Sequence, residues 1–399
     1  MKKPNVAEKR TRKPERLKLK RKFILGHLER AGRIPRARRN RRNMKVGVVK
    51  LLSEISNETT QSAHDQIFDV FFTDGEKETF RDTICMRYGV SDPLLELRPE
   101  LALAEVLGAM RCTERIQKTL CDDRLPDCNT PSTYAVGIEL TDGKVVRIPG
   151  IQKWKRIVSF RNFAKHACSY LSLIRSRVKD TVLKEADTHE ITALAKLLVL
   201  IHSKFTSFDA SAREHLYRES KCYMLGRIAG WHNLSLGAHT LLQDGERREL
   251  HELVCRSIYD GTYTSERLAY VWGDIHFGNV LVENGGNYLL PIDPRVKASF
   301  PGVADPGLDV GFIVVDLWWF YRVYNNPVFK QLAGLFLDVY EASSGDRSIR
   351  SAAAESGVPY RTAMRLKAPY VKPNELKQAR PFVTDMFQWL REHKIDVSL

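Results

Sequence analysis

The chain has 399 residues, of which 43% are hydrophobic and 9% aromatic, and this is the composition of a globular protein that can hold two domains. Its formal net charge of +15 arises within the first 50 residues, where 20 Lys and Arg stand against three acids, so the rest of the chain is close to neutral. Seven scattered cysteines without a CxxC pair argue against a structural zinc site, and the lack of an apolar run of about 18 residues argues against a membrane span. We therefore expect a cytoplasmic protein with free thiols.

Residues 1–44 form a basic tail whose like charges and few large apolar side chains predict disorder when the tail is isolated. Three interpretations are open. The tail could bind a polyanion such as nucleic acid or an acidic membrane, direct the protein to the nucleus or another compartment, or be a solvated extension without a function. A less basic segment begins at Met44, which makes this residue an alternative start of the chain.

Residues 45–128 are predicted to be a helical N-terminal segment, because apolar residues recur at roughly helical spacing in the run 101–110. A loop rich in Pro, Asp and Asn follows at 121–132. The next stretch, 133–150, reads "TYAVGIEL", "TDG" and "KVVRIPG", and this pattern predicts a β-hairpin.

The remaining chain is predicted to contain two helices, a strand and a helical C-terminal third, at about 155–178, 188–204, 221–230 and from about 307 onward. The second helix begins with "DTHE", in which Asp187 and Glu190 have the spacing of a capping box. The apolar run "FIVVDLWWF" at 312–320 is predicted to be a buried helix, since it is too short to span a membrane and contains Asp316.

The most informative run is "VWGDIHFGNVL" at 271–281, which places Asp274 and Asn279 close together before a hairpin. The predicted strands of this hairpin, joined through "NGG", are 280–283 and 288–292. A hairpin returns the chain to its starting point, so Asn279 at one foot and Asp293 at the other are expected side by side. Two oxygen ligands beside Asp274 suit a hard divalent cation such as Mg²⁺.

The pattern Gly-Asp274-x-His276-x-x-Asn279, followed by Ile-Asp293, resembles the signature of the aminoglycoside phosphotransferase family within the protein-kinase-like superfamily. The resemblance implies that Asp274 accepts or orients the attacking hydroxyl and that Asn279 and Asp293 hold Mg²⁺ at the nucleotide phosphates. The run "DPGLDVG" resembles the family's "DPxxDxA" element, so Asp309 would be a buried residue that hydrogen-bonds the catalytic loop. His276 would pack in or stabilise this loop.

The run "YMLGRIAG" resembles the strand and interlobe linker that pair with adenine in this family, which implies nucleotide contacts by Met224, Gly226 and Ile228. The cation that faces the nucleotide has two candidates. Arg147 matches the position in "KVVRIPG", and Lys184 is the alternative, with Glu190 as a possible ion-pair partner; it is also open that neither serves. Two further departures are Trp272, where the family usually has His, and the lack of a Gly-rich phosphate loop before the first hairpin.

The resemblance implies an α+β, bilobal protein-kinase-like fold with a small sheet-containing N-lobe, a large helical C-lobe and an N-terminal helical and basic extension. The predicted boundaries are 1–44 for the tail, 45–128 for the helical segment, 129–228 for the N-lobe and 229–399 for the C-lobe, with a catalytic loop at 271–281 and a metal-binding hairpin at 279–293.

The implied reaction is Mg²⁺-dependent transfer of the γ-phosphate of ATP or GTP to a hydroxyl of a small molecule such as a sugar, an aminoglycoside or another metabolite. The alternatives are a protein-directed kinase recruited by its basic tail and a pseudokinase that acts as a binding module. The run "GDIHFGN" also resembles calcineurin-like metallophosphoesterases, but these need several histidines for two metals, and after His276 the chain has only His393.

Overall fold

The computed structural model shows a chain that combines α-helices and β-strands. The described residues are 44–56, 64–74, 77–88, 133–140, 145–146, 154–162, 168–203, 210–220, 243–246, 248–249, 252, 265–283, 288–291, 302–366 and 375–393. The basic tail 1–43, the helical pattern at 101–110 and the expected strand 221–230 lie outside them.

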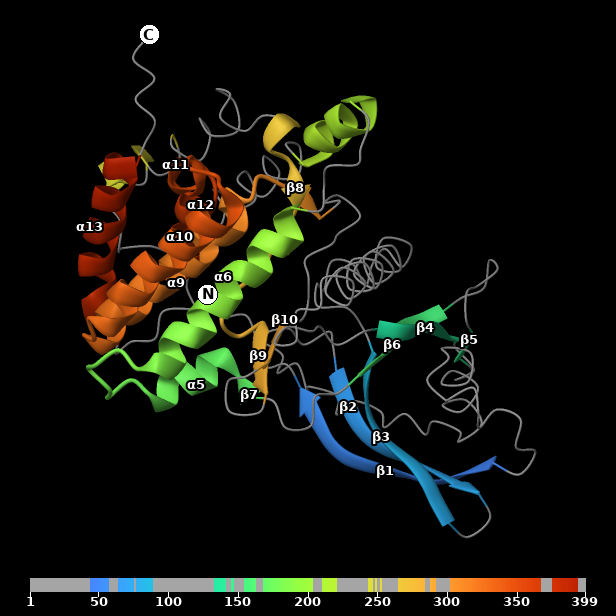
Figure 1. Cartoon of the computed structure of the whole chain (residues 1–399). Helices are drawn as coiled ribbons and strands as arrows, with labels where there is room; N and C mark the ends of the chain where they lie inside the picture. The colour runs from blue at the N-terminus through green and yellow to red at the C-terminus, as the bar shows by residue number, and fades with distance from the viewer. Residues whose placement is uncertain are drawn as a thin grey trace, which may run out of the picture.

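Helix α9 (Gly307–Tyr324) is the central helix of the helical region (Figure 1). Around it stand α5 (Tyr170–Ser176), α6 (Glu185–Ser203), α10 (Val328–Ser344), α11 (Ile349–Glu355), α12 (Gly357–Arg365) and α13 (Leu376–His393). Helix α9 contacts α10, α11, α12 and α13, and α6 packs along α10. Because α9 is apolar around its whole circumference, it can be stable only when other helices cover it. The predictions of a helical C-terminal third and of a buried helix at 312–320 are confirmed.

Helices α9 and α12 cross with their backbones in contact. A Cβ atom on Gly311 would lie 2.5 Å from the carbonyl carbon of Gly357, a distance that real Cβ atoms do not reach. Glycine is therefore required where the two helices cross, and the close approach brings the side chains of α12 against the face of α9.

An antiparallel six-stranded sheet precedes the helices, with strand order β1-β2-β3-β6-β4-β5 (Figure 1). The strands are β1 (Met44–Ser56), β2 (His64–Asp74), β3 (Lys77–Tyr88), β4 (Thr133–Leu140), β5 (Val145–Val146) and β6 (Trp154–Asn162). The predicted hairpin at 133–150 is confirmed by the pairing of β4 with β5.

Two helix predictions in this region are wrong in part. The segment predicted as helical from 45 to 128 forms strands β1, β2 and β3 over its described residues, which end at 88. Of the next predicted helix, 155–178, residues 155–162 belong to β6, and residues 170–176 form α5 as predicted. Runs such as "IFDVFFT" and "RIVSF" are rich in β-branched and aromatic residues, which favour strands. The boundary predicted between 128 and 129 also divides strands of a single sheet.

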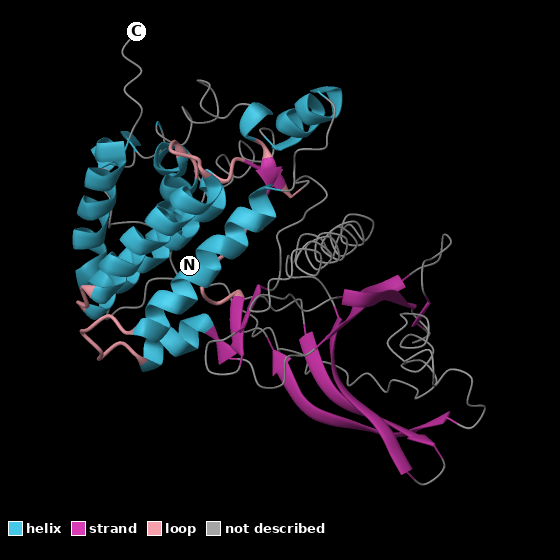
Figure 2. Cartoon of the chain, viewed as in Figure 1, coloured by secondary structure: helices cyan, strands magenta, loops and turns pink. Residues whose placement is uncertain are grey.

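Two small sheets surround the run 271–281 (Figure 2). One contains β10 (Tyr288–Pro291), β9 (Val280–Glu283) and β7 (Cys168–Ser169), and the other pairs β8 (Ala269–Tyr270) with β11 (Val303–Ala304). In the first sheet Val280 lies opposite Pro291 and Glu283 opposite Tyr288, so the predicted hairpin is confirmed.

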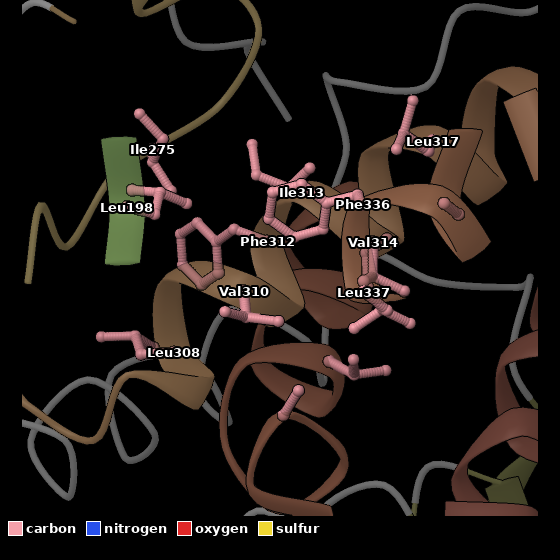
Figure 3. Packing of buried hydrophobic residues seen from close by; sticks show 14 of the residues in the cluster. Leu198, Ile275, Leu308, Val310, Phe312, Ile313, Val314, Leu317, Phe336 and Leu337 are labelled. Atoms are coloured by element: carbon pink, nitrogen blue, oxygen red, sulfur yellow. The ribbon is translucent and has the colours of Figure 1, made fainter. Parts of the chain in front are cut away.

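The hydrophobic core lies between α9 and the elements around it. Figure 3 shows Leu198 of α6 and Ile275 of the loop beside Phe312 of α9, with Phe336 and Leu337 of α10 near Ile313 and Val314. All seven side chains are fully or almost fully buried. Among the helices that the structure describes, none has the length and apolarity needed to cross a lipid bilayer.

Candidate active site

The loop from Val271 to Asn279 alternates buried apolar side chains with half-buried polar ones. Val271, Trp272, Ile275 and Phe277 are buried in the core, and they form one hydrophobic cluster with the residues of the central helix α9. The polar side chains of Asp274, His276 and Asn279 are half-buried. The apolar residues fix the path of the backbone, so the polar groups between them are held at defined positions.

Asp309 binds the start of this loop from the first turn of α9. Its carboxylate is 0% exposed and accepts hydrogen bonds from the backbone N–H of Trp272 at 2.5 Å and of Gly273 at 2.8 Å. Gly273 has φ +76°, a left-handed conformation that favours glycine. The resemblance implied this kind of contact for Asp309, and it holds the two residues that precede Asp274.

A buried histidine and tyrosine extend this contact. His202 of α6 lies with Nε2 3.3 Å from Oδ2 of Asp309 and with Nδ1 2.6 Å from the hydroxyl of Tyr340 on α10. An ionised carboxylate can only accept, so Nε2–H of His202 donates to Asp309. His202 therefore links Asp309 to Tyr340, and three helices converge on the loop.

An ion pair also joins Arg267, which precedes the loop, to Asp305, which precedes α9. Nε of Arg267, in the 3-10 turn η1 (Ser265–Arg267), donates to Oδ2 of Asp305 at 2.7 Å, and Oδ1 of Asp305 accepts the backbone N–H of Gly307 at 2.7 Å. Arg267 also binds Asp346 at 3.0 Å. Burial raises the pKa of Asp305, and the Arg267 guanidinium opposes that change. The "DPG" run is therefore a buried ion-pair site at the start of α9 as well as a turn.

Asn279 is fixed against the backbone of Asp274. Its Nδ2 donates to the carbonyl oxygen of Asp274 at 3.0 Å, and its backbone N–H donates to the carbonyl oxygen of His276 at 2.8 Å. Because a carbonyl oxygen can only accept, the amide nitrogen of Asn279 must face Asp274 and the amide oxygen must point elsewhere. An amide oxygen is a ligand type that hard divalent cations prefer.

His276 supports the turn that leads to Asn279. Its Nδ1 accepts the backbone N–H of Gly278 at 3.0 Å. The pKa of His276 is lowered to about 4, first because burial disfavours the charged imidazolium and then because of the positive charge of Arg361. The ring is therefore neutral at physiological pH, and the Nδ1 lone pair is engaged within the loop.

A ladder of aromatic and charged side chains lies between α9 and α12. Phe312, Asp316 and Phe320 of α9 follow at intervals of four residues, and the guanidinium groups of Arg361 and Arg365 lie 5.2 Å from the Phe312 ring centroid and 5.7 Å from that of Phe320. Both arginines donate to the buried Asp316 carboxylate at 2.8–2.9 Å. Although burial disfavours its charge, the two guanidinium groups hold the pKa of Asp316 well below its usual range.

The ladder reaches the loop through aromatic packing, because the rings of Phe277 and Phe320 lie 5.8 Å apart. Sequence reasoning missed this cluster as part of the site. The signal was present in "FIVVDLWWF", since a charged residue within a buried helix requires a buried partner of opposite charge.

The predicted ion pair between Lys184 and Glu190 is wrong. The Lys184 side chain is 55% exposed and its Nζ binds Asp180 at 2.6 Å, whereas Glu190 is buried and accepts from NH1 and NH2 of Arg177 at 3.0 and 3.1 Å. Residues six apart on a helix point in different directions, unlike those three or four apart, so Lys184 could not reach Glu190.

The capping prediction for this helix needs a related correction. Helix α6 begins at Glu185, and Oδ2 of Asp187 accepts the backbone N–H of Lys184 at 3.3 Å. Asp187 is thus the third residue of the helix and reaches back to the cap position, which is Lys184. Glu190 lies one turn farther along and serves a tertiary contact instead of a cap.

The other predicted site residues lie outside the described residues. These are Asp293, two residues beyond Pro291 of β10, and Arg147, Met224, Gly226 and Ile228. Within the described residues, the structure brings Asp274, His276, Asn279 and Asp309 together in one loop and its support, and it separates Lys184 from Glu190. Among the residues described, no group of three or more His, Cys, Asp or Glu side chains could hold a metal ion by itself.

Comparisons with known proteins give similarity in structure alone. No protein-family profile matches the chain. No curated protein matches it either. Among solved structures, the chain is similar to a spectinomycin phosphotransferase in complex with ADP and spectinomycin (13% identity, 93% of this chain and 99% of that chain, TM-score 0.39). It is also similar to a glucosamine kinase (13% identity, 90% and 95%, TM-score 0.44) and to a macrolide 2′-phosphotransferase type I (14% identity, 94% and 97%, TM-score 0.41). With TM-scores below 0.5, these similarities leave the function to be argued from the residues of the chain itself.

Proposed function

We propose that the chain is a phosphotransferase of the protein-kinase-like type, which moves the γ-phosphoryl group of ATP or GTP to a hydroxyl of a small molecule. The observation that carries the proposal is the paired placement of Asp274 and Asn279. They are joined by a hydrogen bond of 3.0 Å, on a loop whose backbone is bound by the buried Asp309, at the foot of a hairpin that leads to Asp293.

Asp274 is assigned the role of the group that meets the acceptor. Its carboxylate orients the acceptor hydroxyl and takes the hydroxyl proton as the oxygen attacks the γ-phosphorus. The bond from this phosphorus to the bridging oxygen breaks, and the nucleoside diphosphate leaves with the electron pair. The protein contributes position and charge in this reaction and forms no covalent bond to the phosphoryl group.

Asn279 and Asp293 are assigned to the metal. The amide oxygen of Asn279 and a carboxylate of Asp293 fit Mg²⁺, which when bound would offset the negative charge of the β- and γ-phosphates. The hairpin register supports this assignment, because Asn279 is the residue before Val280, Val280 pairs with Pro291, and Asp293 follows Pro291 by two residues.

The six-stranded sheet would be the small lobe and the helices from α5 onward the large lobe. The chain passes from β6, which ends at Asn162, to β7, which begins at Cys168. In this order the change from the six-stranded sheet to the helices precedes α6, and the run 222–230 follows α6 in the sequence. Contacts of Met224, Gly226 and Ile228 with the nucleotide, and of Arg147 with its phosphates, stay predictions.

A small-molecule acceptor is favoured over a protein because the sequence lacks a Gly-rich phosphate loop before its first predicted hairpin. The pseudokinase alternative was based partly on Trp272. In the structure the Trp272 side chain is fully buried and its backbone N–H still donates to Asp309. The exchange of His for Trp therefore leaves the backbone support of the loop in place, which favours an active enzyme.

Turnover by point variants tests the proposal. Wild-type protein, Asp274→Asn and Asp293→Asn are assayed for Mg²⁺-dependent release of ADP from ATP with a panel of amino sugars, sugars and amino alcohols. We expect both variants to lose about 100-fold or more in kcat. Asp338→Asn is the control, because the Asp338 side chain is 71% exposed and pairs with Arg350 far from the loop in sequence. Equal rates for wild type and Asp274→Asn would overturn the proposal.

A further inference from the structure

A second set of buried groups supports the later part of the loop, near Phe277 and Asn279. The Asp309 contacts, in comparison, are at the start of the loop, at Trp272 and Gly273. Glu190 of α6 is buried and accepts both terminal nitrogens of Arg177, while NH1 of Arg177 also binds Asp187 at 2.7 Å. The negative charges of Glu190 and Asp187 act electrostatically on Tyr170, which is 3% exposed at the start of α5. We call Tyr170, Arg177, Asp187 and Glu190 the α5–α6 cluster.

The α5–α6 cluster reaches the loop through Tyr170. Its ring packs edge to face with the ring of Phe277, with ring centroids 5.0 Å apart and an interplanar angle of 77°. The next residue, Leu171, donates its backbone N–H to the carbonyl oxygen of Phe277 at 2.9 Å. Phe277 is therefore held by an aromatic contact and a hydrogen bond from two successive residues of one segment.

The same segment also pairs with the hairpin. Cys168 lies opposite Val282 and Ser169 opposite Leu281 in the antiparallel pairing of β7 with β9. Residues 168–171 thus contact the chain before Asn279, at Phe277, and after it, at 281–282. In the sequence, Asn279 lies between these two points of contact.

The energetics favour a rigid cluster. Burial raises the pKa of Glu190, and the Arg177 guanidinium opposes this change, so the buried carboxylate depends on its hydrogen bonds with Arg177. A buried charged group that loses its partner destabilises the folded protein, and this penalty holds Arg177, Asp187 and Glu190 in one arrangement. Burial, and next the negative charge of Glu190, also raise the pKa of Tyr170, which keeps its hydroxyl protonated.

We infer that Tyr170 and Glu190 are positioning residues for Asn279, and that they set the affinity of the site for the metal–nucleotide complex. The inference rests on the proposed function. Asp309 holds Trp272 and Gly273, on the Asp274 side of the loop, whereas the α5–α6 cluster holds Phe277 and the strand after Asn279. Damage to the cluster therefore changes the binding of Mg²⁺ with nucleotide more than the chemical step.

Four variants of the full chain test the inference. Tyr170→Ala removes the ring from Phe277, Tyr170→Phe keeps the ring and removes only the hydroxyl, and Glu190→Gln keeps the shape but removes the charge that binds Arg177. Val383→Ala on α13 is the stability control, because it deletes buried methyl groups of the core far along the chain. Thermal unfolding checks that the control loses as much stability as Tyr170→Ala; if it loses less, Val358→Ala replaces it.

Two readouts are measured on each variant. Amide hydrogen exchange of peptides that cover 277–282 reports on the loop without any ligand, and calorimetric titration with ADP, with and without Mg²⁺, reports on the site. For Tyr170→Ala we expect at least about tenfold faster exchange in this segment and a dissociation constant for ADP that rises about tenfold in the presence of Mg²⁺. Glu190→Gln should show a smaller change of the same sign, and Tyr170→Phe should stay within about threefold of wild type. ADP binding without Mg²⁺ should change by less than twofold.

The outcomes separate this inference from the proposed function. If wild-type protein does not bind ADP, the proposed function fails, and the exchange data alone decide whether the cluster holds the loop. Exchange at 277–282 that is the same in Tyr170→Ala as in Val383→Ala overturns the inference. Faster exchange with unchanged Mg²⁺-dependent ADP affinity also overturns it, because the contact would then be structural alone.

Discussion

Asp309 illustrates how a buried residue of α9 can fix the backbone that precedes Asp274. Its two carboxylate oxygens accept three N–H groups, from Trp272, Gly273 and His202. Each of these bonds involves an ionised acceptor, and charge-assisted hydrogen bonds are about twice as strong as neutral ones. The loop backbone is thereby fixed within two residues of Asp274.

Substitution of Asp309 by Asn should reduce kcat more than it changes substrate binding. An asparagine offers a single acceptor oxygen and turns an NH₂ group toward one of the three donors, so the backbone at 272–273 must shift. We expect kcat to fall about 10- to 100-fold while the KM for the nucleotide changes less than threefold. Steady-state kinetics measure both constants, and a fall in kcat no larger than that of Asp338→Asn would contradict the account.

His276 gives the protein a pH-dependent contribution to stability. Its pKa in the folded state is about 4, below the ordinary value of 6.5, so the unfolded chain binds a proton more tightly than the folded chain. The contribution is complete above pH 6.5 and is lost as the pH falls from 6.5 to about 4. Its upper limit is about 3–4 kcal/mol, at about 1.4 kcal/mol for each pKa unit.

A His276→Asn variant measures this contribution. An Asn side chain can accept the Gly278 N–H but does not titrate. We expect the difference in unfolding free energy between pH 7 and pH 4.5, obtained from urea titrations, to be smaller in the variant than in wild type by about 1–3 kcal/mol. An equal loss of stability in both proteins would show that the His276 ring is already accessible to protons in the folded state.

Helix α9 joins the parts of the site. Its first turn carries Asp309, its middle carries Asp316 with Arg361 and Arg365 above it, and Phe320 contacts Phe277 of the loop. Gly311 allows α12 to approach, which places both arginines over this face. The loop is thus supported from three successive places along one helix, at Asp309, Asp316 and Phe320.

Removal of the Asp316 charge should therefore destabilise the whole helical region. Asp316→Asn leaves two guanidinium groups, one buried and one largely buried, against a neutral partner, and breaking a buried ion pair from one side costs about 3–5 kcal/mol. Asp338→Asn at the exposed pair with Arg350 should cost less than about 1 kcal/mol. Chemical denaturation of the two variants compares the costs, and similar values would mean that the Asp316 cluster is open to solvent.

Helices and strands were predicted well from the sequence where a turn motif or an apolar pattern within the element itself identifies them. The hairpin 280–283 with 288–292 was evident from its "NGG" turn, and the C-terminal helices from 307 onward from their apolar pattern. The strands β1, β2 and β3 pair in chain order and were missed because the helical spacing in 101–110 was extended over the whole segment.

The site, too, could be predicted only where its residues belong to a motif in the sequence. Asp274, Asn279 and Asp309 belong to a motif whose order can be read along the chain, and the backbone contacts of Asp309 follow from it. The partner of Glu190 could not be read in this way, since Arg177 comes from the end of another helix and lies 13 residues earlier. Tertiary packing selects such partners, and a single sequence contains no periodic signal for them.

The whole chain combines a nearly neutral body with a strongly basic tail. Residues 1–43 carry 18 Lys and Arg, and strand β1 begins at Met44, directly after them. A chain that starts at Met44 therefore keeps the complete strand while it loses the tail. This makes truncation a clean test of the expected contact with a polyanion.

Full-length and truncated protein should differ in their affinity for duplex DNA and for vesicles that contain anionic lipid. If the tail contacts phosphate groups, the logarithm of the binding constant of the full chain falls steeply with the logarithm of the salt concentration. We expect the truncated chain to bind at least about 100-fold more weakly in 50 mM salt and to keep its phosphotransferase rate. Equal binding by both chains would remove the polyanion role, and preference for DNA over vesicles, or the reverse, would identify the partner.

The central claim is that Asn279 and Asp293 share one metal ion. The most direct test is to measure how many metal ions the chain binds and how tightly it binds them. Mn²⁺ can replace Mg²⁺ as a paramagnetic probe, and its free concentration is measured by electron paramagnetic resonance in the presence of ADP. We predict one tightly bound Mn²⁺ per chain in wild type, and at least about tenfold weaker binding in Asn279→Ala and in Asp293→Ala, while Asp338→Asn behaves as wild type. If either of the two hairpin variants binds Mn²⁺ as tightly as wild type, Asn279 and Asp293 do not share one metal ion, and the proposed phosphotransferase site is wrong.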